Sequence, residues 1–127
     1  MTYTIRQGRA NLPEPRHGHC LAYDQKDNVI FVTGGIVSGT KHGPSSKAWK
    51  FHDPEKFILD GTTHMKKGRW DHGCGIVRSN MHNGRPLLVV AGSMKGSAPD
   101  GGGGNNCEFY DYTRQGSQWE LCSKSNS

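Results

Sequence analysis

Five β-favouring residues and two glycines form the stretch VIFVTGG at residues 29–35. An unbroken run of this kind is typical of a strand buried on both faces, and the glycines permit a sharp change of direction where the strand ends. A polar turn at residues 24–28 separates the run from LAY at residues 21–23. The chain is therefore expected to form two antiparallel strands here, with Arg16 and His19 in front of them.

The same order of features occurs a second time. Arg69-Trp70-Asp71-His72 precedes GIV at residues 75–77, a polar turn at residues 79–84 and the run LLVVAG at residues 87–92. We align the closing glycine of this second run, Gly92, with Gly35 of the first. Two copies of one unit, about 50 residues apart, indicate a repeat architecture.

Each unit continues with a loop rich in Gly, Ser and Lys and then two more short strands. The loops are residues 36–46 and 93–106, the third strands are residues 47–52 and 107–112, and the fourth strands begin at Phe57 and Trp119. Apolar character falls from the second strand to the fourth, as expected for a sheet with one buried and one exposed edge. A single sheet of this kind cannot bury both of its faces and needs neighbours.

This pattern resembles the kelch repeat, in which an Arg and a His precede the first strand, a diglycine follows the second and a Trp opens the fourth. The resemblance covers nearly the whole chain and implies an all-β fold of two four-stranded antiparallel blades of a kelch-type β-propeller. Two positions depart from the pattern, because Phe57 stands where Trp is usual and Ala91-Gly92 replaces the second diglycine. In this interpretation Arg16 and Arg69 donate to loop carbonyl groups, and the other structural residues are Gly34, Gly35, Gly92, Phe57, Tyr112 and Trp119.

The resemblance also divides the chain into four parts. Residues 1–12 correspond to the fourth strand of a preceding blade, residues 13–64 to one blade, residues 65–122 to a second blade, and residues 123–127 to a polar tail. Propellers contain about four to eight blades. The ring is therefore completed either by the remaining blades of a larger propeller or by further copies of this chain. The extra strand at residues 1–12 favours the first alternative.

Composition argues against two classes of partner. The formal net charge is +5, but the basic residues are spread along the chain and the longest basic run is Lys66-Lys67, so no nucleic-acid-binding stripe is expected. No stretch contains the roughly 20 apolar residues of a membrane span, and the first 12 residues lack the apolar core of an export signal. We expect a soluble chain, cytoplasmic or secreted, without nucleic-acid or membrane partners.

Four cysteines allow three pairings into two disulfides. They are Cys20, Cys74, Cys107 and Cys122. A zinc ribbon is excluded because it needs closely spaced cysteine pairs. Cys107 and Cys122 fall on the third and fourth strands of one unit and form the candidate disulfide, expected to be bonded if the protein is secreted.

The sequence contains none of the common catalytic motifs, since G-x-S-x-G, H-E-x-x-H and G-x-x-x-x-G-K-[ST] are all missing. His17 and His19 are weak candidates for a metal pair if they lie on one strand and point to the same side, with His42 or His72 as a third ligand. We expect no enzymatic activity and no cofactor. The alternative function is a fragment of a kelch-propeller enzyme or carbohydrate-binding protein similar to galactose oxidase.

Loops at one end of kelch propellers commonly bind a partner, and the resemblance assigns this role to residues 36–46, residues 93–106 and the segments before each first strand. Arg and Trp are frequent in binding hot spots, which singles out Arg69-Trp70, and basic loops suit an acidic or phosphorylated peptide. We therefore expect a protein–protein interaction module. Its candidate partner-binding residues are Arg16, His17, Lys41, His42, Ser45, Arg69, Trp70, Lys95 and Asp100.

Overall fold

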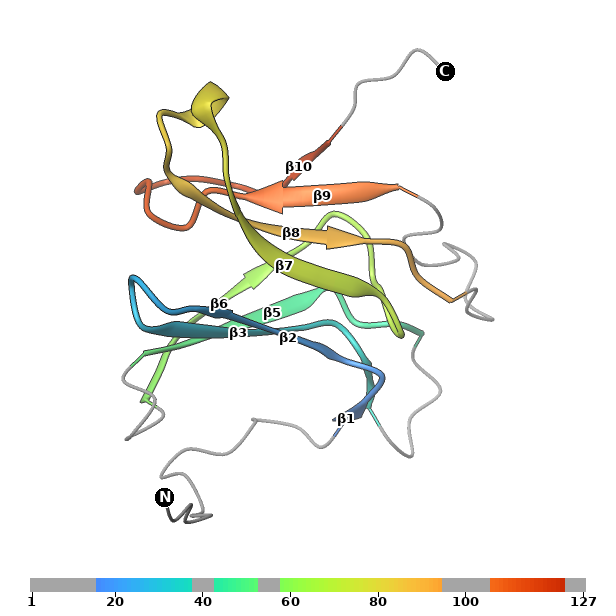
Figure 1. Ribbon diagram of the computed structural model, residues 1–127. Coiled ribbons are helices and arrows are strands. Elements are labelled where there is room, and N and C mark those ends of the chain that lie inside the picture. Colours follow the sequence, from blue (N-terminus) through green and yellow to red (C-terminus); the bar gives the residue numbers. More distant parts are fainter. Residues whose placement is uncertain (1–15, 38–42, 53–57, 95–105, 123–127) are drawn as a thin grey trace, which may run out of the picture.

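The computed structural model describes residues 16–37, 43–52, 58–94 and 106–122 (Figure 1). They form an all-β molecule with two four-stranded antiparallel sheets. Helical structure in them is confined to a 3₁₀ turn, η1 (Asn80–His82). None of their helical segments could cross a membrane.

The first sheet has the strand order β2-β3-β5-β6. Its strands are β2 (Cys20–Asp24), β3 (Val29–Thr33), β5 (Lys47–His52) and β6 (Ile58–His64). The tight turn between β2 and β3 contains Asn28 at φ 58°, a conformation that Asn tolerates better than most residues. All four strands therefore follow each other in chain order from one edge of the sheet to the other.

The second sheet is built in the same way, with β7 and β10 at its edges. Its strands are β7 (Gly73–Arg78), β8 (Pro86–Ala91), β9 (Cys107–Tyr110) and β10 (Glu120–Leu121). The turn η1 lies between β7 and β8, where the Ser79 side chain accepts a hydrogen bond from the Met81 amide. Four-stranded sheets in both units agree with the sequence prediction.

Two details of the strand prediction are wrong. Residues 36–46, expected to form only a loop, begin with the short strand β4 (Ile36–Val37), which pairs with β1 (Arg16–His17). The third strand of the second unit ends at Tyr110, so Tyr112 lies in the turn that follows it. Strands of two residues carry no periodicity from which to predict them.

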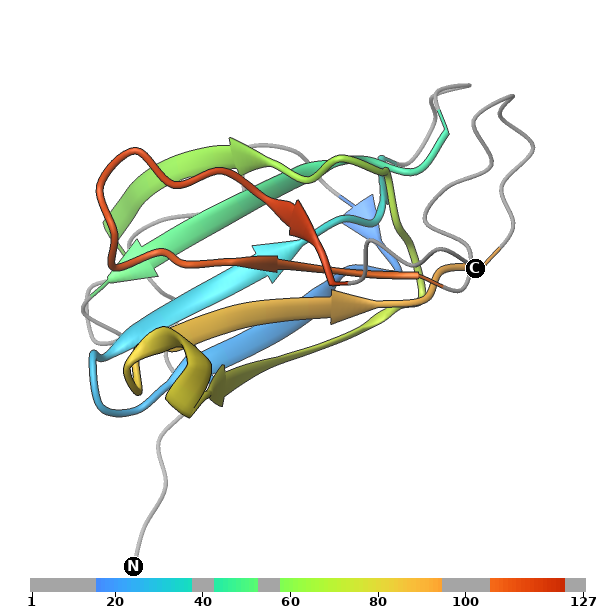
Figure 2. The same ribbon diagram turned by 90° about the horizontal axis from the view of Figure 1, so that it is seen from above.

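The two sheets pack face to face, with one layer over the other (Figures 1 and 2). The core between them combines Phe31 of the first sheet with Leu88 and Val90 of the second, and Trp119 closes it from the segment before β10. Strand β2 lies closest to β7 across this interface, and the Trp119 indole donates to Thr63 Oγ1 at 3.0 Å near the other edge. Core side chains from both sheets therefore form one cluster.

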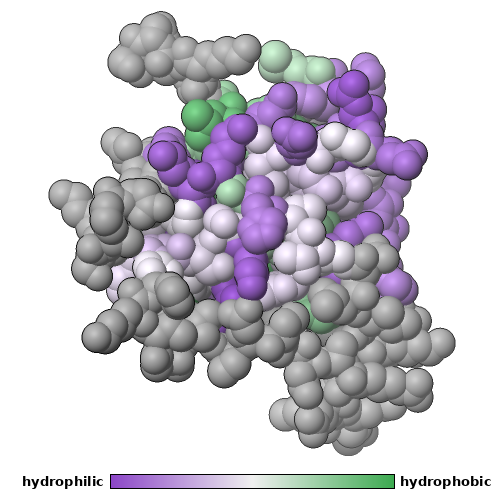
Figure 3. Space-filling view, turned by 180° about the vertical axis from the view of Figure 1, so that it is seen from behind, coloured by the Kyte–Doolittle hydropathy of each residue, from purple (hydrophilic) through white to green (hydrophobic). Residues whose placement is uncertain are grey.

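Apolar side chains also lie on the outer faces of both sheets. On the first sheet, Val32, Trp49 and Phe51 form a second buried cluster, while Leu21 and Tyr23 of β2 are 58% and 48% exposed. The second sheet exposes 48% of Val77 on its outer face. The side of the molecule turned away from the viewer of Figure 1 is mostly hydrophilic or neutral where it is coloured (Figure 3).

All four cysteines are bonded, in two disulfides. Cys107 and Cys122, the candidate pair from the sequence, are joined beside β9 and β10. Cys20 and Cys74 are joined across the interface between the sheets, on β2 and β7. Of the three ways to pair four cysteines that the sequence left open, the structure has Cys20–Cys74 with Cys107–Cys122.

Strand register gives a residue-by-residue correspondence between the sheets. Leu21 and Trp49 lie opposite Val32 in the first sheet, and Cys74 and Glu108 lie opposite Val90 in the second. The amide of Gly34 donates to the Lys47 carbonyl (2.9 Å), and the amide of Gly92 donates to the Asn106 carbonyl (3.0 Å). Gly92 therefore corresponds to Gly34 rather than to Gly35, which corrects the alignment made from the sequence.

Candidate functional site

The candidate site is the end of the two sheets where the segments before β2 and β7 meet the segments after β3 and β8. We call this region the loop edge, and in the described part of the chain it consists of residues 16–19, 34–36, 43–47, 65–72, 92–94 and 106–108. Its centre is Arg69, whose side chain is fully buried.

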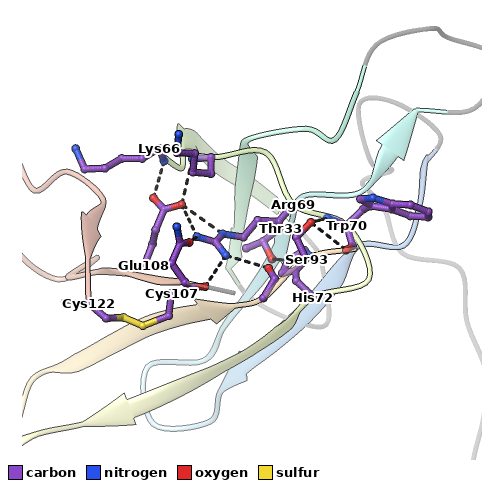
Figure 4. A network of polar contacts seen from close by, with 12 residues as sticks. Thr33, Lys66, Arg69, Trp70, His72, Ser93, Cys107, Glu108 and Cys122 are labelled. Atoms are coloured by element: carbon purple, nitrogen blue, oxygen red, sulfur yellow. Dashed lines mark hydrogen bonds and ion pairs between the residues drawn. A yellow bond between two sulfur atoms is a disulfide. The ribbon is translucent and has the colours of Figure 1, made fainter. Parts of the chain in front are cut away.

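Arg69 uses all five of its N–H groups inside the protein (Figure 4). Nη1 donates to the carbonyl oxygens of Gly92 and Asn106, both at 2.9 Å. Nη2 donates to Asn106 Oδ1 at 2.6 Å and to Glu108 Oε2 at 3.0 Å, and Nε donates to the same carboxylate oxygen at 3.3 Å. One side chain thus fixes the exit of β8 and the entry of β9.

Glu108 completes this network as a second fully buried charge. Its two carboxylate oxygens accept hydrogen bonds from the backbone amides of Lys66 (2.6 Å) and Lys67 (3.1 Å). The carboxylate therefore anchors the segment that leads into Arg69. Sequence reasoning did not identify Glu108, although an acidic residue within the strand CEFY was the available signal.

Arg16 makes the corresponding bond in the first repeat. Its Nη1 donates to the Gly34 carbonyl at 2.7 Å, and its guanidinium lies 3.9 Å from the centre of the Trp49 ring. Trp49 and Glu108 occupy the same position in the two sheets, so the arginine rests on an aromatic ring in one repeat and on a carboxylate in the other. Both arginines bond glycine carbonyls, as the structural interpretation predicts, and both are buried. Neither arginine side chain is therefore exposed to a partner, although both were expected to be partner-binding residues.

Backbone hydrogen bonds join the two repeats along the loop edge. The Gly35 amide donates to the Arg69 carbonyl (2.7 Å), the Arg69 amide donates to the Ser45 carbonyl (3.0 Å), and the Asp71 amide donates to the Gly18 carbonyl (2.7 Å). Gly34 permits this approach because a Cβ there would lie 2.3 Å from the Arg69 oxygen. The loop edge is consequently one connected surface.

His72 ties the same region to β3. Its Nε2 lies 2.7 Å from Thr33 Oγ1. Burial, followed by the nearby positive charge of Arg69, lowers the pKa of His72 from 6.5 to about 4. His72 is therefore neutral at physiological pH, which suits a structural hydrogen bond with a hydroxyl group.

Trp70 differs from its neighbours because its ring points away from the Arg69 network (Figure 4). Its backbone amide donates a hydrogen bond to Ser93 Oγ (3.2 Å), and its carbonyl oxygen accepts one from the Met94 amide (3.0 Å). The ring is half-buried and meets His17 edge to face, with ring centres 6.5 Å apart. Around it, His17, Asp71 and Met94 are exposed. Trp70 is thus a partly exposed aromatic side chain on a fixed backbone.

The expected geometry for a histidine metal pair is wrong. His17 belongs to β1, whereas His19 lies just before β2, and Gly18 between them has φ 69°. The two histidines therefore do not share one strand. Among the described residues, no three His, Cys, Asp or Glu side chains are arranged to hold a metal ion.

Of the remaining residues predicted from the sequence, two lie in the described part of the chain and the others lie outside it. Ser45 belongs to the loop edge, where its hydroxyl accepts from the Lys47 amide at 3.1 Å. Trp119 is buried and stacks on Tyr110 with ring centres 5.3 Å apart, in keeping with a structural role. The residues Phe57, Lys41, His42, Lys95 and Asp100 lie outside the described part of the chain.

A second polar cluster, at the opposite end of the sheets, was not predicted. Asp24 of β2 is buried and accepts hydrogen bonds from Arg78 of β7, at 3.0 and 3.1 Å, and from the Tyr112 hydroxyl. Burial alone raises the pKa of Asp24. The hydrogen bonds from Tyr112, Arg78 and the Asp27 amide, together with the charge of Arg78, outweigh burial and lower the pKa to about 2. The cluster thus adds an ion pair between the sheets.

No protein-family model matches this chain, and no curated protein matches it. The site must therefore be interpreted from its own residues. Its buried charges are engaged in structural bonds, and its accessible groups at Trp70 are suited to non-covalent recognition.

Proposed function

We propose that this chain is a protein-interaction module in which two blades of a kelch-type β-propeller present the loop edge to a protein or peptide partner. The repeated Arg-to-Gly bond supports the assignment of two equivalent blades, since Arg16 and Arg69 reach the carbonyls of Gly34 and Gly92 at the same point of each sheet. Repeats of one supersecondary unit that stack on each other are the basis of propellers and solenoids.

The apolar outer faces favour blades over an isolated two-layer sandwich. In a sandwich the outward-facing positions are mainly polar, whereas the outer faces here carry Leu21, Tyr23 and Trp49 on one sheet and Val77 and Phe109 on the other. Blades of a propeller have neighbours on both sides, so apolar residues on both faces are expected of them.

The observation that carries the recognition function is the placement of Trp70. The preceding residue is locked by five hydrogen bonds, so the Trp70 backbone is pre-organised while its ring remains partly exposed. Rigid aromatic anchors lose little entropy on binding and are enriched in hot spots. Exposed His17 and Met94 beside the ring extend the contact surface.

Charge on the loop edge favours an acidic partner. The described residues of this region carry five positive charges and two negative ones, a net charge of +3 with histidine neutral. The charged residues are Arg16, Lys47, Lys66, Lys67, Arg69, Asp71 and Glu108. Arg16, Arg69 and Glu108 are buried, so the accessible charges are three lysines and Asp71, which still leave a positive surface. A surface of this sign attracts an acidic segment to the loop edge.

Selection of a phage-displayed random peptide library on the folded chain tests this function. We expect acidic peptides to be enriched, and we expect Trp70→Ala to weaken their binding by at least about 30-fold, the equivalent of a hot-spot residue. Met81→Ala is the control, because Met81 is 90% exposed on η1, outside the loop edge. Selected peptides without an acidic bias, or with equal affinity for the wild-type and Trp70→Ala chains, would contradict the proposal.

A further inference from the structure

The contact between β2 and β7 is made of three successive pairs. Cys20 is bonded to Cys74, Ala22 belongs to the same apolar cluster as Ile76, and Asp24 forms an ion pair with Arg78. These residues alternate along each strand, so they define the inner stripe of β2 and the inner stripe of β7.

Strand register identifies the equivalents of these stripes on the outer faces. Leu21 and Tyr23 occupy in the first sheet the positions that Cys74 and Ile76 occupy in the second. The same offset along the sequence relates Arg78 to Gln25, the first residue of the turn after β2. We call Leu21 and Tyr23 the outer β2 stripe. The outer β7 stripe consists of Gly73, Gly75 and Val77. By the same correspondence these residues are equivalent to Cys20, Ala22 and Asp24.

The two outer stripes are open and differ in size. Leu21, Tyr23 and Val77 are each about half exposed, at 58%, 48% and 48%. A Cβ atom added at Gly75 would meet nothing within 4 Å. Gly73 and Gly75 bring no side chains to the outer β7 stripe, which therefore leaves room for the large side chains of the outer β2 stripe.

For each residue pair of the inner contact, the equivalent pair on the outer stripes differs at both positions. The disulfide Cys20–Cys74 becomes Gly73 with Leu21, so no thiol is left without a partner. At the position of the ion pair Asp24–Arg78 the outer stripes carry Val77 and, in the turn after β2, the neutral Gln25, so no charge is buried alone. The outer stripes thus match each other in chemistry as well as in position.

We propose that the outer β2 stripe of one copy of this chain packs on the outer β7 stripe of a second copy, continuing the β2–β7 contact between molecules. The contact joins two different surfaces, so it is heterologous, and its repetition closes a ring of copies where the rotation between neighbours divides a full turn. This inference uses no residue of the loop edge and stands apart from the partner-binding function.

Light scattering of the wild-type chain and of two face-specific variants tests the proposal. We expect the wild type to exceed its monomer mass of 14.0 kDa at concentrations up to about 1 mM. Tyr23→Lys places a charge on the outer β2 stripe, and Gly75→Lys places a long charged side chain on the outer β7 stripe without meeting another atom at its Cβ. Each variant alone is expected to remain at 14.0 kDa.

Mixing the two variants distinguishes a heterologous contact from a symmetric one. The Gly75→Lys chain retains its outer β2 stripe and the Tyr23→Lys chain retains its outer β7 stripe, so a one-to-one dimer is expected from the mixture and from neither variant alone. Circular dichroism of each variant verifies that it is folded. A folded wild type that stays monomeric throughout would overturn the inference and indicate that other sheets cover these faces. A wild-type oligomer whose variants form no mixed dimer would also overturn it. Loss of peptide binding in Trp70→Ala is a separate readout that neither result affects.

Discussion

Two residue positions determine how the loop edge is held. One is the arginine before each sheet, and the other is the residue on the third strand of each sheet that lies opposite Val32 or Val90. Arg16 pairs with the Trp49 ring and Arg69 pairs with the Glu108 carboxylate. The second arrangement is the more demanding, because both charges are fully buried. A buried ion pair is stable only when both partners are hydrogen-bonded, and every N–H of Arg69 meets this condition.

Substitution Glu108→Gln is therefore expected to be strongly destabilising. It leaves the Arg69 charge buried without a counter-charge, so the free energy of unfolding should fall by about 3–5 kcal/mol, measured by urea denaturation. Arg85→Gln is the matched control, since the Arg85 side chain is 39% exposed beside the largely buried Asp111. Removing a charge that solvent already screens is expected to cost about 1 kcal/mol or less. Equal losses in the two variants would contradict the role assigned to the buried pair.

Asp24 is expected to make stability depend on pH in acid. Its pKa in the folded chain is about 2, below the ordinary value of 3.8, so the unfolded chain takes up the proton first as the pH falls. The stabilisation is complete above about pH 4, is lost as the pH falls toward 2, and amounts to about 2 kcal/mol. Urea denaturation at about pH 5 and about pH 2 measures the difference. Asp24→Asn should lack this component, and an unchanged pH dependence in that variant would rule out Asp24 as its source.

At the scale of elements, the sequence predicted most of the strands because their apolar runs and polar turns are local features. The order of strands in both sheets follows from the two repeats. The alignment of Gly92 with Gly35 failed because it rested on the diglycine pattern, whereas the correct match with Gly34 depends on hydrogen bonds to Asn106 and Lys47. The pairing of β1 with β4 was also beyond the sequence, since each has only two residues.

The candidate site was predictable only in part. The sequence indicated Arg69 and Trp70 through residue type and position, but it did not separate the buried arginine from the partly exposed tryptophan. Glu108 and Asp24 were missed because their charged partners lie 39 and 54 residues away along the chain. Pairings of this range depend on how the sheets stack, which single-sequence patterns do not encode.

The segment before β7 is expected to be sensitive to added volume at Gly68. A Cβ there would lie 2.0 Å from the Pro44 carbonyl oxygen, so Gly68→Ala must displace backbone, and we expect a loss of about 1–3 kcal/mol in the free energy of unfolding. Gly75→Ala is the control, because its Cβ would meet nothing within 4 Å. Thermal denaturation compares the two variants. A Gly68→Ala chain as stable as Gly75→Ala would mean that the segments 43–46 and 65–69 are not in contact.

At the scale of the whole molecule, the two disulfides hold different parts of the fold. Cys20–Cys74 spans 54 residues and joins the sheets, whereas Cys107–Cys122 spans 15 residues within one sheet. On the loop-entropy model, replacing the first pair by serine should cost about 4 kcal/mol of stability and replacing the second about 3 kcal/mol. Urea denaturation of the two double variants measures this order. A larger loss from the shorter loop would show that strand packing, rather than the link between sheets, dominates the effect.

The central claim is that the two repeats of this chain form two sheets that stack within one molecule, with β2 packed on β7. Disulfide mapping tests this claim most directly. The chain is expressed in an oxidising compartment, digested without reduction, and its linked peptides are identified by mass spectrometry. We expect one peptide pair joined through Cys20 and Cys74 and another joined through Cys107 and Cys122. Bonding of Cys20 or Cys74 to either of the other two cysteines, or free thiols at both positions, would contradict the stacking of β2 on β7.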